Sequence, residues 1–217
     1  MTTDSALATR LGQVHTALLC DVLDSLGFRE AALGASIQAV AGGSSLVGRA
    51  YPLRCEAADR VPDAPYERLI DAFDHLTGGD VIVIATGDDV SAMWGELLST
   101  AAAASGVLGA VMDGLVRDLD DIDEMGFPVF GTGVSPLDSA GRQDVVEHGA
   151  PIRCGDAPVR RGDWIVADRM GVVVVPAHLA LEATDRAEKK MAGESTARAE
   201  LAAGESLGVV FDRHGIL

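Results

Sequence analysis

The segment "DVIVIATG", residues 80–87, constrains the fold most, because its β-branched residues follow one another without polar alternation. Such a run is typical of a strand that is buried on both faces of a sheet. Two more apolar runs follow at 107–114 and 127–134, and helical patterns at about 94–105 and 119–126 separate them. This strand–helix–strand–helix–strand alternation predicts an α/β fold with a parallel or mixed sheet covered by helices.

The segments on either side of this core complete the expected domain. Helical spacing of apolar residues predicts helices at 16–27 and 64–80, and residues 44–57 have the pattern of a strand. Several short strands are expected within 150–176, where Gly-Asp turns recur. Residues of about 177–205 predict one long charged helix or a broken pair, with Gly193 and Gly204 as weak points. Such an arm either lies on its own subunit or reaches a neighbour.

Charge and cysteine content narrow the classes of function. The formal net charge of −16 opposes electrostatic binding to nucleic acid or to an anionic membrane. The three cysteines are odd in number and far apart, which disfavours a disulfide framework or a zinc site and fits a reducing compartment. The first residues lack a secretory leader pattern, and no apolar run is long enough to span a membrane. We therefore expect a cytoplasmic protein.

The stretch "GAVMDGLVRDLDD", residues 109–121, ends an apolar run with Arg117 beside Asp118. If the run pairs in parallel with 80–87, both strands end at one edge of the sheet, where open α/β sheets bind ligands. The helix that starts near Glu96 would begin at that edge too. Its first-turn amides, at Leu97 and Leu98, have no intrahelical partners and can hold a carboxylate.

These groups together suit one kind of chemistry. Arg117 offers a planar, permanently charged donor. Asp118, with Glu96, can supply oxygen ligands to Mg²⁺ or a similar hard cation. A 2-oxo acid suits such a site, because the cation would polarise its keto group and an enolate would be stabilised by the cation and by Arg117. The pattern predicts a metal-dependent aldol cleavage or β-decarboxylation that leaves pyruvate enolate.

Longer matches carry a family resemblance. In "WGELLSTAAAASGVLGAVMDGLVRD", twenty residues separate the acidic Glu96 from the Arg117–Asp118 pair. With "GFPVFGTGVSP", "RRGDWIVADRMGVVVVP" and "LLCDVLDSLG", this pattern resembles the RraA-like family (regulator of ribonuclease activity A). That family includes the class II 4-hydroxy-4-methyl-2-oxoglutarate and 4-carboxy-4-hydroxy-2-oxoadipate aldolases. The resemblance implies a single domain over residues 1–217, built as a swivelling-type β/α sandwich with a mixed sheet, a helical N-terminus and a C-terminal helix.

The resemblance also implies a role for each matching residue. Asp118 matches the direct metal ligand, for which Mg²⁺ or Mn²⁺ is expected, and Arg117 matches the substrate-binding arginine. Leu97 and Leu98 match the residues whose amides bind the pyruvate carboxylate. Glu96 matches the acidic residue that holds metal-bound water, although many members have Asp there.

Further features are implied for the assembly. Family members are typically trimers or hexamers, with active sites between subunits. A glutamate from the C-terminal helix of the neighbouring subunit also holds a metal-bound water. Glu194 is the candidate for that glutamate, and Glu188 is the alternative.

Other interpretations stay open at this point. Arg117 and Asp118 could be a plain surface ion pair, and Glu96 an ordinary first-turn residue. A 4-hydroxy-2-oxo acid lyase releasing pyruvate, with oxaloacetate decarboxylation as a further activity, is the expected function. One alternative is a non-catalytic regulator that binds ribonuclease E, and regulators of this type lack the Asp after the arginine. The other alternative is a lyase or hydratase for another hydroxy acid.

Overall fold

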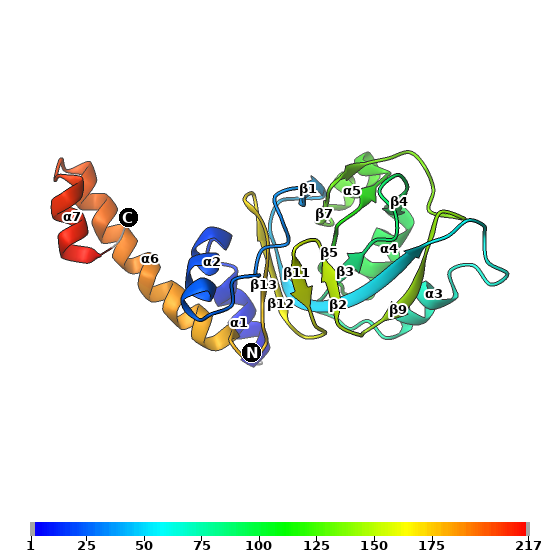
Figure 1. Ribbon diagram of the computed structural model, residues 1–217, viewed down its shortest axis with the longest axis horizontal. Coiled ribbons are helices and arrows are strands. Elements are labelled where there is room, and N and C mark those ends of the chain that lie inside the picture. The colour runs from blue at the N-terminus through cyan, green and yellow to red at the C-terminus, as the bar shows by residue number, and fades with distance from the viewer. Residues whose placement is uncertain (1–2, 216–217) are drawn as a thin grey trace.

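A mixed β-sheet forms the centre of the computed structural model, which describes residues 3–215. Its strands run in the order β1-β7-β5-β3-β2-β12-β13, and β9 also pairs with β2 (Figure 1). The strands are β1 (Gln38–Ala41), β2 (Leu46–Ala57), β3 (Asp80–Ala85), β5 (Gly109–Met112), β7 (Val129–Gly131), β9 (Gln143–His148), β12 (Trp164–Asp168) and β13 (Gly171–Val175).

The middle of the sheet is parallel. Strand β3 pairs in parallel with β2 on one side and with β5 on the other, and β5 pairs in parallel with β7. Strands β1, β9, β12 and β13 are joined antiparallel. Every residue of β3 except Ala85 is buried, as expected for a continuous apolar run covered on both faces. The predicted α/β class with a mixed sheet is therefore confirmed.

Helices cover one face of the parallel strands. They are α3 (Glu67–Asp74), α4 (Glu96–Ala104) and α5 (Leu119–Met125), which share one apolar cluster with β2, β3 and β5. Trp94 lies at the centre of this cluster, stacked between Phe73 and Phe127 with ring centroids 6.5 and 6.3 Å apart. The hairpin of β10 (Ile152–Cys154) and β11 (Ala157–Val159) packs on the opposite face of the sheet.

A second, small sheet continues three of the central strands. It is wholly parallel and consists of β4 (Ala92–Trp94), β6 (Leu115–Val116) and β8 (Gly133–Val134). Strands β3, β5 and β7 lead into β4, β6 and β8 respectively. The single strand expected over 127–134 is therefore two strands in two sheets. A Cβ at Gly131 would lie 2.8 Å from the carbonyl oxygen of Gly114, so a glycine is needed where the chain crosses between the sheets.

Terminal helices form a third layer beside β12 and β13. Helices α1 (Thr3–Leu11), α2 (Thr16–Ser25) and the start of α6 (Ala180–Ala202) enclose an apolar cluster there. Helix α6 then projects away from the sheet and ends beside α7 (Leu207–His214) (Figure 1). It runs unbroken through Gly193 and stops before Gly204, whose φ is +94°. None of the helices within residues 3–215 combines the length and apolar character that crossing a membrane requires.

Candidate functional site

The small sheet brings together the two segments that the sequence singled out. Strands β4 and β6 are parallel neighbours, with Trp94 opposite Val116. The backbone N–H of Arg117 donates to the carbonyl oxygen of Trp94 at 3.0 Å. Gly95 and Arg117, which directly follow these two strands, therefore lie side by side just before α4 and α5. The expected convergence is present, and the pairing of β4 with β6 is its immediate cause.

Asp118 lies against the first turn of α4. Its Oδ2 accepts a hydrogen bond from the backbone N–H of Glu96 at 3.2 Å. A Cβ at Gly95 would lie 2.5 Å from the same oxygen, so only glycine leaves room for this approach. Asp118 itself has a left-handed backbone, with φ of +61°, which Asp and Asn tolerate better than most residues. Together these features aim one carboxylate at a helix N-terminus.

Arg117 lies between two carboxylates. Its Nε is 3.5 Å from Asp118 Oδ2, and its Nη1 is 3.6 Å from Asp138 Oδ2. Charge-assisted hydrogen bonds are shorter, at about 2.7–2.9 Å. The guanidinium is thus oriented by both acids without being saturated by either, and it keeps donors for an anionic ligand.

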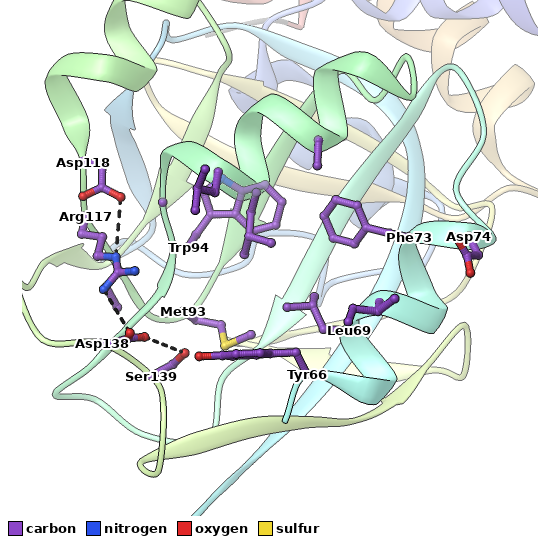
Figure 2. Close-up of a pocket in the computed structure, with 16 residues that line it drawn as sticks. Tyr66, Leu69, Phe73, Asp74, Met93, Trp94, Arg117, Asp118, Asp138 and Ser139 are labelled. Carbon is purple, nitrogen blue, oxygen red and sulfur yellow. Dashed lines mark hydrogen bonds and ion pairs between the residues drawn. The ribbon is translucent and has the colours of Figure 1, made fainter. Parts of the chain in front are cut away.

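A cavity of about 580 Å³ opens beside these groups. Arg117, Asp118, Asp138 and Ser139 line one side of it, and Tyr66, Leu69, Phe73 and Met93 line another (Figure 2). Leu97 and Leu98 belong to its lining as well. The first intrahelical hydrogen bond of α4 runs from the Ser99 N–H to Gly95 O at 3.1 Å. Because the Glu96 N–H donates to Asp118, the amides of Leu97 and Leu98 are the ones that remain available for a ligand.

Glu96 is turned away from this cavity. Its Oε1 accepts a hydrogen bond from the Thr100 hydroxyl at 2.8 Å. The side chain lines a second cavity of about 440 Å³, together with Thr100, Asp121, Glu124 and Met125. The sequence predicted that Glu96 lies near Asp118, which holds for its backbone, but the carboxylate points to the α5 side.

The two candidate glutamates of α6 differ in their surroundings. Glu188 accepts hydrogen bonds from Arg10 Nε and Nη2 at 2.8 and 2.7 Å, and these bonds lower the pKa of its carboxyl. Glu194 has no ion pair with any residue in the part of the chain that the structure describes. Helix α6 lies on the far side of the sheet from α4 (Figure 1), so neither glutamate reaches the cavity of its own chain.

The sequence did not single out two residues of the cavity. Asp138 follows β8, and its carbonyl accepts a hydrogen bond from Arg142 Nη1 at 2.8 Å, so Arg142 supports this loop. Tyr66 precedes α3 with φ of +64°.

Asp113, which directly follows β5, has a structural role. Its carboxylate accepts hydrogen bonds from the backbone N–H groups of Thr86 and Gly155 at 2.7 and 2.9 Å.

A separate donor cluster lies between α3 and β9. Potential ligand atoms of Asp71, His75 and His148 lie within 4.8 Å of one another. His148 Nε2 is 2.8 Å from Asp71 Oδ2, and its Nδ1 is 2.8 Å from the Tyr51 hydroxyl. The hydrogen bond from His148 lowers the pKa of Asp71. Only the i, i+4 spacing of Asp71 and His75 signals this cluster in the sequence.

The groups around Asp118 fit a hard cation. Mg²⁺ prefers one or two carboxylates and keeps several waters. One Asp118 oxygen is held by the Glu96 amide, and the other has no hydrogen-bond partner among the described residues. The carboxylates of Glu96, Asp121 and Glu124, which line the second cavity, add negative charge next to Asp118. The Asp71 cluster, with its two imidazoles, suits a transition metal better.

Comparison with known proteins agrees with this architecture. The chain is 29% identical over 187 residues to a Halalkalibacterium halodurans protein named "Putative 4-hydroxy-4-methyl-2-oxoglutarate aldolase", covering 86% of this chain and 84% of that protein. It is 26% identical to protein DlpA of Legionella pneumophila over 202 residues, and this match covers 93% of this chain but only 32% of DlpA.

A solved structure shares the fold. Streptomyces coelicolor RraAS2, described as an unusual member of the RNase ES inhibitor RraA protein family, superposes with a TM-score of 0.79. It is 28% identical, and the match covers 91% of this chain and 98% of that one. The sequence model of the family described as "RraA-like: Aldolase/RraA" matches residues 16–174. The chain therefore belongs to the RraA-like family of aldolases and RraA proteins.

Proposed function

We propose that the protein is a divalent-metal-dependent carbon–carbon lyase that cleaves a 4-hydroxy-2-oxo acid and releases pyruvate. The observation that supports this most is the convergence of Arg117, Asp118 and the start of α4 on one cavity. Support also comes from the relative named "Putative 4-hydroxy-4-methyl-2-oxoglutarate aldolase", because an aldolase is a carbon–carbon lyase. Decarboxylation of oxaloacetate is a second reaction that the same site would perform, because it also forms pyruvate enolate.

The chain's own donors would hold the pyruvyl end of the substrate. The free amides of Leu97 and Leu98 would bind its carboxylate, helped by the positive end of the α4 dipole. Arg117 would donate to the keto oxygen, where negative charge develops when the enolate forms. Because Asp118 and Asp138 orient the guanidinium beforehand, little reorganisation is needed during the reaction.

Asp118 would hold the cation, Mg²⁺ or Mn²⁺. When bound, such a cation acts as a Lewis acid that polarises the keto group. Glu96 and Glu194 of a neighbouring copy would orient the water that carries the proton of the C4 hydroxyl. For that role the Glu96 carboxylate would leave Thr100 and turn towards Asp118.

We propose that the protein assembles as a homotrimer or homohexamer, because α6 projects away from the central sheet of its own chain (Figure 1). In it, α6 of one copy would approach the cavity of the next. Glu194 is the better candidate than Glu188, because Arg10 already engages Glu188 within its own chain. We further propose a single domain over the whole chain, a cytoplasmic location and no role for nucleic acid.

Exchange of the pyruvate methyl protons with D₂O tests this function without requiring the full substrate to be known. The wild-type protein should catalyse the exchange with Mg²⁺ or Mn²⁺, measured by proton NMR. Arg117→Gln should lower the rate by about 100-fold or more, in the range for loss of a donor to a developing oxyanion.

The alternative is a protein that binds an endoribonuclease and performs no chemistry. In that case the wild-type protein would show no metal-stimulated exchange and would be retained by an immobilised ribonuclease E. That pair of results would contradict the proposed lyase.

A further inference from the structure

The cavity extends well beyond the groups that would hold a pyruvyl end. Asp118, Asp138 and Ser139 lie around Arg117, and an apolar wall continues from Met93 and Trp94 to Leu69 and Phe73, with Asp74 at the far end (Figure 2). Its volume of about 580 Å³ falls within the range of about 300–1,000 Å³ found for small-molecule sites. A pyruvyl group alone would leave most of this space unfilled, so the wall faces the part of the substrate beyond C3.

The charges in the cavity oppose a second carboxylate. Arg117 is the one cation among the described residues that line it, and the proposed function already commits Arg117 to the keto oxygen. The other charged lining residues are Asp74, Asp118 and Asp138. Arg142 does not line the cavity, and its Nη1 donates to the Asp138 carbonyl. A carboxylate on C4 would lose water and would meet no second cationic side chain there among the described residues of the same chain.

The backbone on the apolar side is held in an unfavourable conformation. Within residues 3–215, the non-glycine residues with positive φ are Tyr66 at +64° and Asp118 at +61°, and both line this cavity. Left-handed conformations of bulky residues are costly and cluster at functional sites. In Figure 2 the Tyr66 ring runs along one edge of the cavity, with its hydroxyl end toward Ser139.

From this geometry we infer that the preferred substrates are 4-hydroxy-2-oxo acids with an apolar alkyl or aryl substituent on C4. This inference rests on the proposed function. In the cleavage the C3–C4 bond breaks and its electron pair remains on C3 as the enolate. The C4 hydroxyl loses its proton, so that C4 becomes the carbonyl of an apolar aldehyde. The enolate takes up one proton at C3 to give pyruvate.

Three substrates that share the pyruvyl end test the inference. They are 4-hydroxy-2-oxo-4-phenylbutanoate, 4-hydroxy-2-oxopentanoate and 4-hydroxy-2-oxoglutarate, assayed with the wild-type protein and Mn²⁺ by release of pyruvate. The phenyl compound should have a kcat/KM at least about 10-fold above that of the glutarate, since apolar groups in such pockets change kcat/KM by about 10–200-fold. The methyl compound should fall between them.

Two further results separate failure of this inference from failure of the proposed function. If pyruvate proton exchange is present but the glutarate is cleaved as fast as the phenyl compound or faster, the apolar preference is wrong and the lyase stands. If the exchange is absent as well, the proposed function fails together with the inference.

A cation placed on the apolar wall should reverse the preference. Ile70 lines the cavity and is 61% exposed, so Ile70→Arg tests the wall with little risk to folding. It should lower the ratio of phenyl to glutarate kcat/KM by about 10-fold or more. Met170→Arg, at a 72% exposed position that does not line the cavity, is the matched control and should leave the ratio unchanged. An unchanged ratio in Ile70→Arg would contradict the inference.

Discussion

The backbone N–H of Glu96 and the carboxylate of Asp118 share a hydrogen bond of 3.2 Å, although twenty-one residues separate them in the chain. This bond joins the first turn of α4 to the residue that follows β6 and Arg117. It also leaves one oxygen of Asp118 available for a cation. The charge of Asp118, its position and its neighbours can each be changed separately.

Removing only the charge of Asp118 should stop the metal-dependent reaction. Asp118→Asn keeps the side-chain size and tolerates the left-handed backbone. We expect pyruvate proton exchange to fall by about 100-fold or more and to lose its dependence on Mn²⁺. Asp120→Asn, at an exposed position in the first turn of α5, is the control and should keep wild-type exchange. Full activity in Asp118→Asn would refute the role of Asp118 as cation ligand.

Displacing Asp118 without altering it should also impair activity. In Gly95→Ala the new methyl group would lie 2.5 Å from Asp118 Oδ2, so the carboxylate must move. The φ of Gly95 is −162°, an extended value that alanine adopts, so the effect is steric. A displacement of about 1 Å at a reacting site costs on the order of 100-fold in rate. Steady-state kinetics should show a loss of this order, with little change in Tm.

Gly208→Ala is the matched comparison for that experiment. A Cβ at Gly208 meets no atom within 4 Å in the described structure. Its kinetics should equal those of the wild type. If Gly95→Ala behaved in the same way as Gly208→Ala, close packing against Asp118 would have no part in activity.

Mixing two inactive variants should restore activity if Glu194 acts across subunits. Glu194→Gln and Asp118→Asn would each disable every site in their own homo-oligomer. Co-refolded mixtures would contain some sites with an intact Asp118 and an intact neighbouring Glu194, so part of the wild-type exchange rate should return. Glu188→Gln should retain activity, because Glu188 is bound to Arg10 of its own chain. No recovery on mixing would count against a shared site.

The Asp71–His148 contact should stabilise the fold in a pH-dependent way. The hydrogen bond from His148, with the nearby charges of His148, His75 and Arg68, lowers the pKa of Asp71 in the folded protein. A carboxyl with a depressed folded pKa contributes stability above its ordinary pKa of about 3.9 and loses it as the pH falls through the folded value. Urea unfolding should show Asp71→Asn less stable than wild type at about pH 5–7. The difference should shrink below about pH 4.

A double-mutant cycle identifies the source of that stability. In a His148→Gln background, Asp71→Asn should cost less than it does in the wild type, because the partner is already missing. Equal costs in the two backgrounds would show that Asp71 stabilises the protein through some other contact.

Long apolar patterns made the central architecture predictable. The runs that form β3 and β5 are continuous because both faces of these strands are covered, and their parallel pairing follows from the crossover between them. That pairing places the segments that carry Glu96 and Arg117 at one edge of the sheet, and the pairing of β4 with β6 then brings the two residues together. The break after α6 at Gly204 was also foreseeable, whereas Gly193 continues the helix, since a single helical glycine costs only about 1 kcal/mol.

The parts that escaped prediction depend on contacts between distant segments. Strands β6 and β8 have two residues each, too few to show any periodicity, and they exist because β4 lies beside them. Asp138 reaches Arg117 only through this small sheet. The contacts of the small sheet leave no local signature in the sequence. The direction of the Glu96 side chain is different, because it follows a local hydrogen bond from Thr100, four residues further along α4.

The left-handed conformation of Asp118 has an evolutionary consequence. Asparagine and glycine occupy such a position as readily as aspartate does, so one substitution can delete the carboxylate while every strand and helix keeps its place. If Asp118 holds the cation as proposed, a scaffold of this kind would lose its chemistry in a single step and remain a folded surface on which selection for binding other macromolecules can act.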